Sequence, residues 1–123
     1  MSTTTNISKL RSDFSNLMSN EIQVSVTRTP VTRTNKGFSV SRSDGTPASL
    51  NGIFYLKGRV YSNMPEGWLE NCDALILVSY DATINKEDEI TYGNNNYRVT
   101  AVYGVPSDNS DYSVFKRAEL VKI

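Results

Sequence analysis

The first hydrophobic positions of the chain repeat with a helical period. Five apolar residues fall at spacings of three, four, three and one, which places them on one face of a helix: Ile7, Leu10, Phe14, Leu17 and Met18. Thr5 or Asn6 can accept a hydrogen bond from an unpaired amide of the first turn, and Asn20 can end the helix in the left-handed conformation. The pattern therefore predicts a helix over residues 6–19 that packs by one face.

Beyond Asn20 the period changes to two, which is typical of strands. Apolar and polar residues alternate strictly over 21–28, as expected for a strand with one buried face. Residues 53–61 are rich in β-branched and aromatic side chains and predict another strand. The run 74–78 is continuously apolar but too short for a helix, so it predicts a strand buried on both faces.

The last third of the chain contains the clearest hairpin signal. Alternating strands at 89–92 and 97–102 flank Gly93–Asn96, whose glycine and asparagines tolerate the positive φ of a tight turn. A final strand is expected over 112–122. Its alternation is interrupted by two adjacent apolar residues at 114–115, which leaves room for a bulge at that point.

Residues 28–50 show only weak patterning. The segment is rich in Thr, Ser, Gly, Asn and Pro, and one short strand is expected at 38–40. A weakly patterned stretch of about twenty residues is uncommon inside a compact domain, and such stretches are usually functional or disordered. We therefore predict an extended loop over 28–50, the part of the chain that the fold requires least.

Together these elements predict a single mainly-β domain over residues 1–123. One helix followed by five to seven strands, with no second helical pattern, is typical of a small antiparallel β-barrel or sandwich. The edges of such a sheet must be closed or covered, and the N-terminal helix is the expected cover.

The composition excludes several classes of chemistry. The 123 residues (13.7 kDa) include no histidine, which removes the commonest general base, histidine-containing triads and histidine-ligated metals. Cys72 is the one cysteine and cannot form an intrachain disulfide, so nothing requires an oxidising compartment. No stretch is apolar enough to span a membrane, and the N-terminus does not resemble a secretion signal.

Charge is balanced overall but not along the chain. Lys plus Arg and Asp plus Glu number 13 each, and the isoelectric point is about 6.2. Residues 1–62 carry eight cations and three acids, net +5, whereas residues 63–123 carry five cations and ten acids, net −5. The two halves could attract one another between copies of the chain, or the asymmetry could be chance scatter on a solvated surface.

Two features invite a test for catalysis, and neither supports it. The acids at 87–89 and Asp81 lack the alternating oxygen ligands around a glycine turn that a Ca²⁺ loop needs, so 87–89 is interpreted as a solvated turn. Cys72 has no histidine to activate it and lies beside Asp73, which would raise the pKa of its thiol, so it is expected to be inert. We expect no catalytic residues, no cofactor, no metal site and no enzymatic activity.

The weakly patterned segment is basic. Arg28, Arg33, Lys36 and Arg42 are opposed within 28–50 only by Asp44. A mobile basic loop suits a polyanion, because phosphate contacts need charge more than a fixed shape. The alternative is ordinary solvated loop charge.

Tyrosines recur on the expected strands or at their ends. The set is Tyr55, Tyr61, Tyr80, Tyr92, Tyr97, Tyr103 and Tyr112. Tyrosines on strands can form a stacking platform for nucleic-acid bases, or they can fill the core and rim of a barrel. Both interpretations stay open from the sequence.

The segment 73–103 carries a resemblance to a known family. An apolar strand ends in Tyr80-Asp81, an acidic stretch follows, and two strands meet at a glycine and asparagine turn. The positions that carry this pattern are Tyr80, Asp81, Ile84, Asp88, Ile90, Tyr92, Tyr97 and Val99. The pattern resembles the C-terminal half of the head-closure (stopper) proteins of tailed bacteriophages, which belong to the head–tail connectors. Asp81 is expected to bond the backbone of its own corner, with Ile84 and Ile90 closing the barrel end.

The resemblance implies a non-enzymatic virion protein of the phage neck, assembled in the host cytoplasm. Copies would form a ring of twelve-fold symmetry on the portal or an adaptor ring, close the DNA channel, and offer the other face to a tail-completion or tail protein, with no membrane partner. Carried over to this chain, the loop 28–50 would point Arg28, Arg33, Lys36 and Arg42 toward packaged double-stranded DNA. Neutral replacements would then leave the fold intact but let heads leak DNA.

Two other functions fit the same features. A tail terminator or tail-completion ring would bind the tail tube instead of the head. A small barrel that binds single-stranded nucleic acid would show an affinity that falls steeply with salt.

Overall fold

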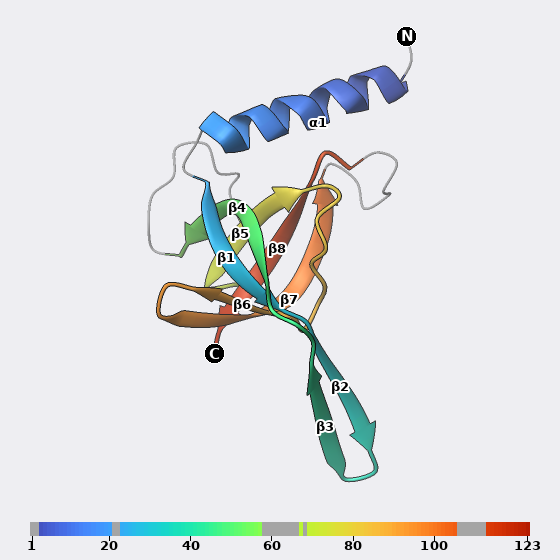
Figure 1. Cartoon of the computed structure of the whole chain (residues 1–123), viewed down its shortest axis with the longest axis vertical. Helices are drawn as coiled ribbons and strands as arrows, with labels where there is room; N and C mark the ends of the chain where they lie inside the picture. The colour runs from blue at the N-terminus through green and yellow to red at the C-terminus, as the bar shows by residue number, and fades with distance from the viewer. Residues whose placement is uncertain (1–2, 21–22, 58–66, 68, 106–112) are drawn as a thin grey trace.

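The protein folds as one helix followed by a series of strands (Figure 1). The computed structural model describes residues 3–20, 23–57, 67, 69–105 and 113–123. In chain order the elements are α1 (Thr3–Asn20), β1 (Val24–Thr29), β2 (Val31–Lys36), β3 (Ser39–Asp44), β4 (Ala48–Leu56), β5 (Ala74–Ser79), β6 (Glu89–Tyr92), β7 (Asn95–Val105) and β8 (Phe115–Lys122).

Six of the strands close into an antiparallel barrel in the order β1-β4-β5-β8-β7-β6. Closure comes from β1, which pairs with β4 along most of its length and with β6 at its end, where Thr27 lies opposite Thr91. A closed barrel has no unpaired edge, so the helix is not needed as an edge cover. The mainly-β prediction is confirmed, with the barrel rather than the sandwich as its form.

The barrel interior holds the main hydrophobic core. Its fully buried members come from every strand of the barrel except β4, and they include Val26, Ile76, Ile90, Val99 and Leu120. Gly52 on β4 is required by close packing, because a Cβ there would lie 2.6 Å from the backbone oxygen of Leu77.

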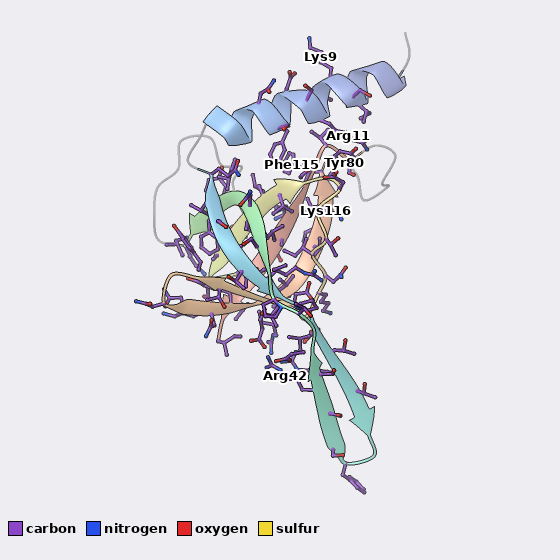
Figure 2. The ribbon with its side chains drawn as sticks, in the orientation of Figure 1. Lys9, Arg11, Arg42, Tyr80, Phe115 and Lys116 are labelled. Atoms are coloured by element: carbon purple, nitrogen blue, oxygen red, sulfur yellow. The ribbon has the colours of Figure 1, made fainter. Side chains whose placement is uncertain are left out.

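A second cluster lies between the barrel and α1, on the outer face of β5. Phe14 of the helix stacks on Phe115 with ring centroids 4.7 Å apart, above Leu75 and Leu77. Figure 2 shows Phe115 and Tyr80 directly beneath the helix. Because Ile76 and Leu75 face opposite sides, both faces of β5 are buried, as its uninterrupted apolar run predicted.

The expected hairpin near the C-terminus is confirmed with a shorter turn. Tyr92 pairs with Asn95, so the turn residues are Gly93 and Asn94, and Gly93 has a φ of +61°. The bulge predicted at 114–115 is wrong: the register shift lies on β7, between Val99 and Ala101. The part of the predicted strand 53–61 beyond Lys57 lies outside the described residues.

Most of the segment predicted as an extended loop over 28–50 is instead a second β-hairpin over 31–44, and its two ends belong to β1 and β4. The short strand expected at 38–40 overlaps the start of β3. Strands β2 and β3 form a separate two-stranded sheet that projects from the barrel on the side opposite α1 (Figure 1). Gly37, with a φ of +63°, provides the turn. The prediction was wrong because it relied on hydrophobic alternation, which a strand acquires only when one of its faces is buried; every residue of β3 is exposed.

Candidate functional site

The candidate site is the root of the β2–β3 hairpin, where three arginines meet three consecutive acids. We call these residues the root cluster: Arg28, Arg33 and Arg42 with Glu87, Asp88 and Glu89. The arginines come from the end of β1 and from both hairpin strands, whereas the acids come from the turn before β6 and from its first residue, Glu89. Each acid contacts a different arginine.

Arg28 and Asp88 form the buried pair of the root cluster. Arg28 Nε donates to Asp88 Oδ2 at 2.6 Å, and the side chains are 15% and 4% exposed. The same carboxylate oxygen accepts a hydrogen bond from the backbone N–H of Asn85 at 2.8 Å. A buried carboxylate needs such partners, so Arg28 and the turn at Asn85 hold each other in place.

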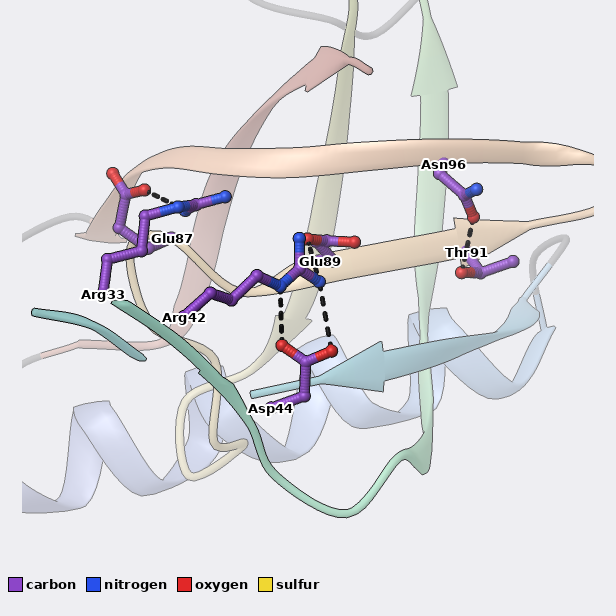
Figure 3. Close-up of polar contacts among 7 residues, drawn as sticks. All are labelled: Arg33, Arg42, Asp44, Glu87, Glu89, Thr91 and Asn96. Carbon is purple, nitrogen blue, oxygen red and sulfur yellow. Dashed lines mark hydrogen bonds and ion pairs between the residues drawn. The ribbon is translucent and has the colours of Figure 1, made fainter. Parts of the chain in front are cut away.

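Arg33 contacts Glu87 closer to solvent. Arg33 Nη1 donates to Glu87 Oε2 at 2.6 Å (Figure 3). Glu87 adopts a φ of +79°, an unusual conformation for a residue with a Cβ, and its N–H donates to Val99 O at 2.8 Å. From this strained backbone conformation the Glu87 carboxylate reaches Arg33 on the hairpin.

Arg42 contacts two acids at once. Its Nε and Nη2 donate to the two carboxylate oxygens of Asp44 at 2.7 and 3.2 Å (Figure 3). This hydrogen bond from Arg42 is the main reason that the pKa of Asp44 lies below its ordinary value. Arg42 Nη2 also lies 2.6 Å from Glu89 Oε2, an oxygen that is buried yet lacks a hydrogen bond of good geometry.

The root cluster changes the interpretation of both charged segments. The acids 87–89 are not a solvated turn, because Asp88 is buried and all three acids hold arginines. Part of the opposite charge on the two halves of the chain is therefore paired within one molecule. Lys36, the fourth predicted cation, ends β2 opposite Ser39 in the backbone register.

The positions that carry the family resemblance are largely structural. Ile84, Ile90, Tyr97 and Val99 are buried in the barrel core, and Tyr92 packs against it. Asp81 accepts a hydrogen bond from the Ser79 hydroxyl at 2.6 Å; the backbone bond of this corner runs from Ala82 N to Ser79 O. Within the described residues, the expected bond from Asp81 to the corner backbone is replaced by this side-chain contact.

Tyr80 belongs to the contact between the barrel and the helix. The guanidinium of Arg11 lies 3.7 Å from the centre of the Tyr80 ring, and Arg11 Nε also donates to Ser113 O at 2.8 Å (Figure 2). These contacts fix the helix on the barrel together with the stacked phenylalanines.

The tyrosines do not gather as a platform for bases among the residues that the structure describes. Tyr92 and Tyr97 both pack on Phe54, with ring centroids 4.6 and 5.5 Å away, and Tyr103 lies beneath Arg117. Tyr61 and Tyr112 lie outside the described residues. The barrel-filling interpretation fits Tyr92 and Tyr97.

Cys72 is buried, and its surroundings disfavour the thiolate. Burial raises the pKa of the Cys72 thiol, and the negative charge of Glu119 raises it further; the adjacent Asp73, which the sequence suggested as the cause, is not the acid responsible. Across the described ranges, no three acid or cysteine side chains gather as a metal site, and no helix is long and apolar enough to cross a membrane.

No protein-family model matches this chain, and no curated protein matches its sequence significantly. The root cluster and the fold therefore carry the functional argument. Sequence reasoning missed the root cluster, although one signal was available. Arg28 continues the alternation of Val24 and Val26, which places it on the inward face of β1.

Proposed function

We propose that this chain is a structural protein of the neck of a tailed bacteriophage, of the head-closure type. Copies would form a ring on the portal or an adaptor ring, with the β2–β3 hairpins directed at packaged double-stranded DNA and another face offered to the tail. The observation that carries the proposal is the hairpin itself, a basic arm anchored to a small closed barrel.

The dimensions of the arm suit a ring that narrows a channel. Each hairpin strand has six residues, which at about 3.3 Å per residue gives an arm of roughly 20 Å. Phe38 and Val40 at its far end are exposed, so the tip adds nothing to the barrel core. An arm that long, fixed only at its root, can reach from the wall of a ring toward its axis.

The barrel suits repeated side-by-side contact. A ring uses two different surfaces of each subunit, and a closed barrel presents all its strands without an open sheet edge that could cause uncontrolled aggregation. The helix side and the hairpin side of this barrel differ (Figure 1), as a protein with two different neighbours requires.

The structure refines which cations are expected to face DNA. Arg28 is committed to buried Asp88, so its neutral replacement would leave an unpaired buried carboxylate and disturb the fold. Arg33 and Arg42 are the partly exposed arginines of the set, and Lys36 lies farther along the arm. We therefore keep Arg33, Lys36 and Arg42 as the candidates for the DNA channel.

Electron microscopy of phage particles made with and without this chain tests the proposal. Without the chain, we expect heads that have packaged DNA to lose it and to carry no tails, and the chain itself should co-purify with portal-bearing heads. Heads that stay full and acquire tails without the chain would contradict the proposal. Co-purification with tails alone would favour the tail terminator, and tight binding of single-stranded oligonucleotides would favour the nucleic-acid-binding barrel.

A further inference from the structure

Arg33 and Arg42 form a pair that the fold does not require. The register of β2 and β3 places them directly opposite one another, which puts both side chains on the same face of the hairpin. Like charges at directly opposed positions destabilise a sheet. Two guanidinium groups held this close are, however, well suited to oxyanions, because each presents a planar fork of donors to a carboxylate or a phosphate.

In the isolated chain this arginine pair is occupied by carboxylates of the same molecule. Glu87 holds Arg33, whereas Glu89 and Asp44 hold Arg42 (Figure 3). Glu87 and Glu89 belong to the barrel and Asp44 to the hairpin, so only the first two attach the arm to the barrel.

The contacts that Glu87 and Glu89 make with the arginine pair can be replaced by contacts with another anion. Glu87 reaches Arg33 only from a strained backbone, and the side chains of that pair are about a third exposed. Glu89 Oε2 lies close to Arg42 but lacks a well-oriented hydrogen bond. An exposed ion pair such as Arg33–Glu87 contributes little stability and weakens with salt, so an anion of higher charge density can replace the Glu87 carboxylate. The Glu89 side chain is only 18% exposed, and its exchange depends instead on the poor orientation of its contact with Arg42.

We propose that Glu87 and Glu89 are intramolecular substitutes for phosphate, which mask the arginine pair until the backbone of double-stranded DNA displaces them. This inference rests on the proposed function, since it assumes that the hairpin meets packaged DNA. The buried Arg28–Asp88 pair joins β1 to the turn before β6, both within the barrel, and stays closed during the exchange. The mask explains how a basic arm can avoid nucleic acid before assembly and engage DNA where its local concentration is very high.

Binding of a short DNA duplex to the purified full-length chain, followed by fluorescence anisotropy over a range of salt concentrations, tests the mask. The E87Q/E89Q variant removes both negative charges but keeps amides that can accept hydrogen bonds. We expect its affinity for duplex to rise by on the order of tenfold at low salt, with the slope of log K against log salt steeper by about two, as for two new phosphate contacts.

A charge-matched control separates unmasking from a general loss of negative charge. D13N/E70Q removes two acids from exposed positions outside the root cluster, and its affinity should stay close to that of the wild type. Adding R33Q/R42Q to E87Q/E89Q should abolish the gain. An equal gain in the control, no gain in E87Q/E89Q, or a gain that survives R33Q/R42Q would overturn the proposal.

The failure of this inference can be told apart from the failure of the proposed function. Circular dichroism confirms that each variant is folded before binding is measured, and the anisotropy needs no phage particle. If E87Q/E89Q binds duplex more tightly but phage heads retain their DNA without the chain, the masking proposal stands and the neck function is refuted. If heads lose DNA without the chain but E87Q/E89Q binds duplex no more tightly than the wild type, the neck function stands and the masking proposal is refuted.

Discussion

The barrel and the hairpin are stabilised by different forces, although they are parts of one continuous chain. The barrel buries apolar side chains on the inside of every strand pair and again beneath α1. The hairpin, apart from Val31 at its root, exposes its described side chains and is tied to the barrel by ion pairs. The barrel, with its buried side chains, has the character of a scaffold. The hairpin has the character of an arm whose exposed side chains can contact a partner.

Substitutions in the barrel and in the hairpin should have different effects. Apolar burial is worth about 25 cal/mol per Å² and is concentrated in the barrel. Exposed ion pairs contribute about 0–1 kcal/mol each. Changes in the barrel should therefore alter folding, whereas changes in the outer hairpin should alter binding and leave folding intact.

The largest effect is expected from a cavity in the barrel core. Ile76→Ala should lower the free energy of unfolding by about 2–5 kcal/mol, because the side chain is fully buried and the surrounding strands cannot collapse around the gap. Val40→Ala, on the exposed hairpin, should change it by less than about 0.5 kcal/mol. Chemical denaturation measures both, and equal losses would erase the distinction between the two regions.

The next largest effect is expected at Arg28, where the two regions join. Arg28→Gln should cost about 3 kcal/mol, since it leaves the buried Asp88 carboxylate without its cation. Arg33→Gln, which breaks a more exposed pair, should cost less than about 1 kcal/mol. The double variant R28M/D88N removes both charges but keeps a side-chain oxygen for the Asn85 N–H. If it regains most of the stability, the loss in R28Q comes from the unpaired charge; no recovery would point to another role for Arg28.

The reactivity of a cysteine thiol should differ between the buried barrel and the exposed hairpin. Because burial raises the pKa of Cys72, the folded chain holds the thiol proton more tightly than the unfolded chain does. The buried neutral thiol therefore contributes fully to stability below the ordinary thiol pKa of about 8.5. This contribution is lost as pH rises through the higher pKa that the thiol has in the folded chain. A maleimide should label Cys72 slowly at pH 8 unless denaturant is added, whereas a cysteine introduced by Ser41→Cys should react at once. Rapid labelling of Cys72 in the folded wild-type chain, which keeps Ser41, would contradict the burial of Cys72.

The smallest effect is expected from removing the arm altogether. Pro30 O accepts a hydrogen bond from Gly45 N at 2.7 Å, and Val31 lies opposite Asp44, so the root is already closed by backbone contacts. Replacing 32–43 by Asn-Gly, a favoured two-residue hairpin turn, should leave the thermal midpoint nearly unchanged. The nuclear magnetic resonance spectrum of the barrel amides should also be retained. An unfolded product would show that the hairpin is part of the scaffold.

The barrel could be predicted from the sequence because its strands have buried faces. Alternation over 21–28, the apolar run 74–78 and the Gly93 turn each reflect a local requirement of a closed sheet. The bulge was misplaced because adjacent apolar residues at 114–115 also arise where a strand begins beneath a helix, as Phe115 does. Such a contact between distant segments leaves no local pattern.

The root cluster could be predicted only in part. Its arginines and acids were each noticed as charged segments, but they are separated by about half the chain, and their pairing depends on barrel closure between β1 and β6. Arg28 continues the alternation of inward-facing residues on β1, and this was the local sign of a buried cation. The hairpin carried only a short apolar signal at 38–40, because every residue of β3 is exposed.

The most direct test of the account is DNA retention in phage heads that carry the R33Q/R42Q chain. We expect the variant to fold and join the particle but to leave heads that lose DNA, as scored by electron microscopy and by nuclease sensitivity of the DNA. The matched K57Q/K122Q variant, which removes two cations from the barrel side, should retain it. Full, nuclease-resistant heads with R33Q/R42Q would contradict the role of the hairpin as the part of the molecule that meets DNA.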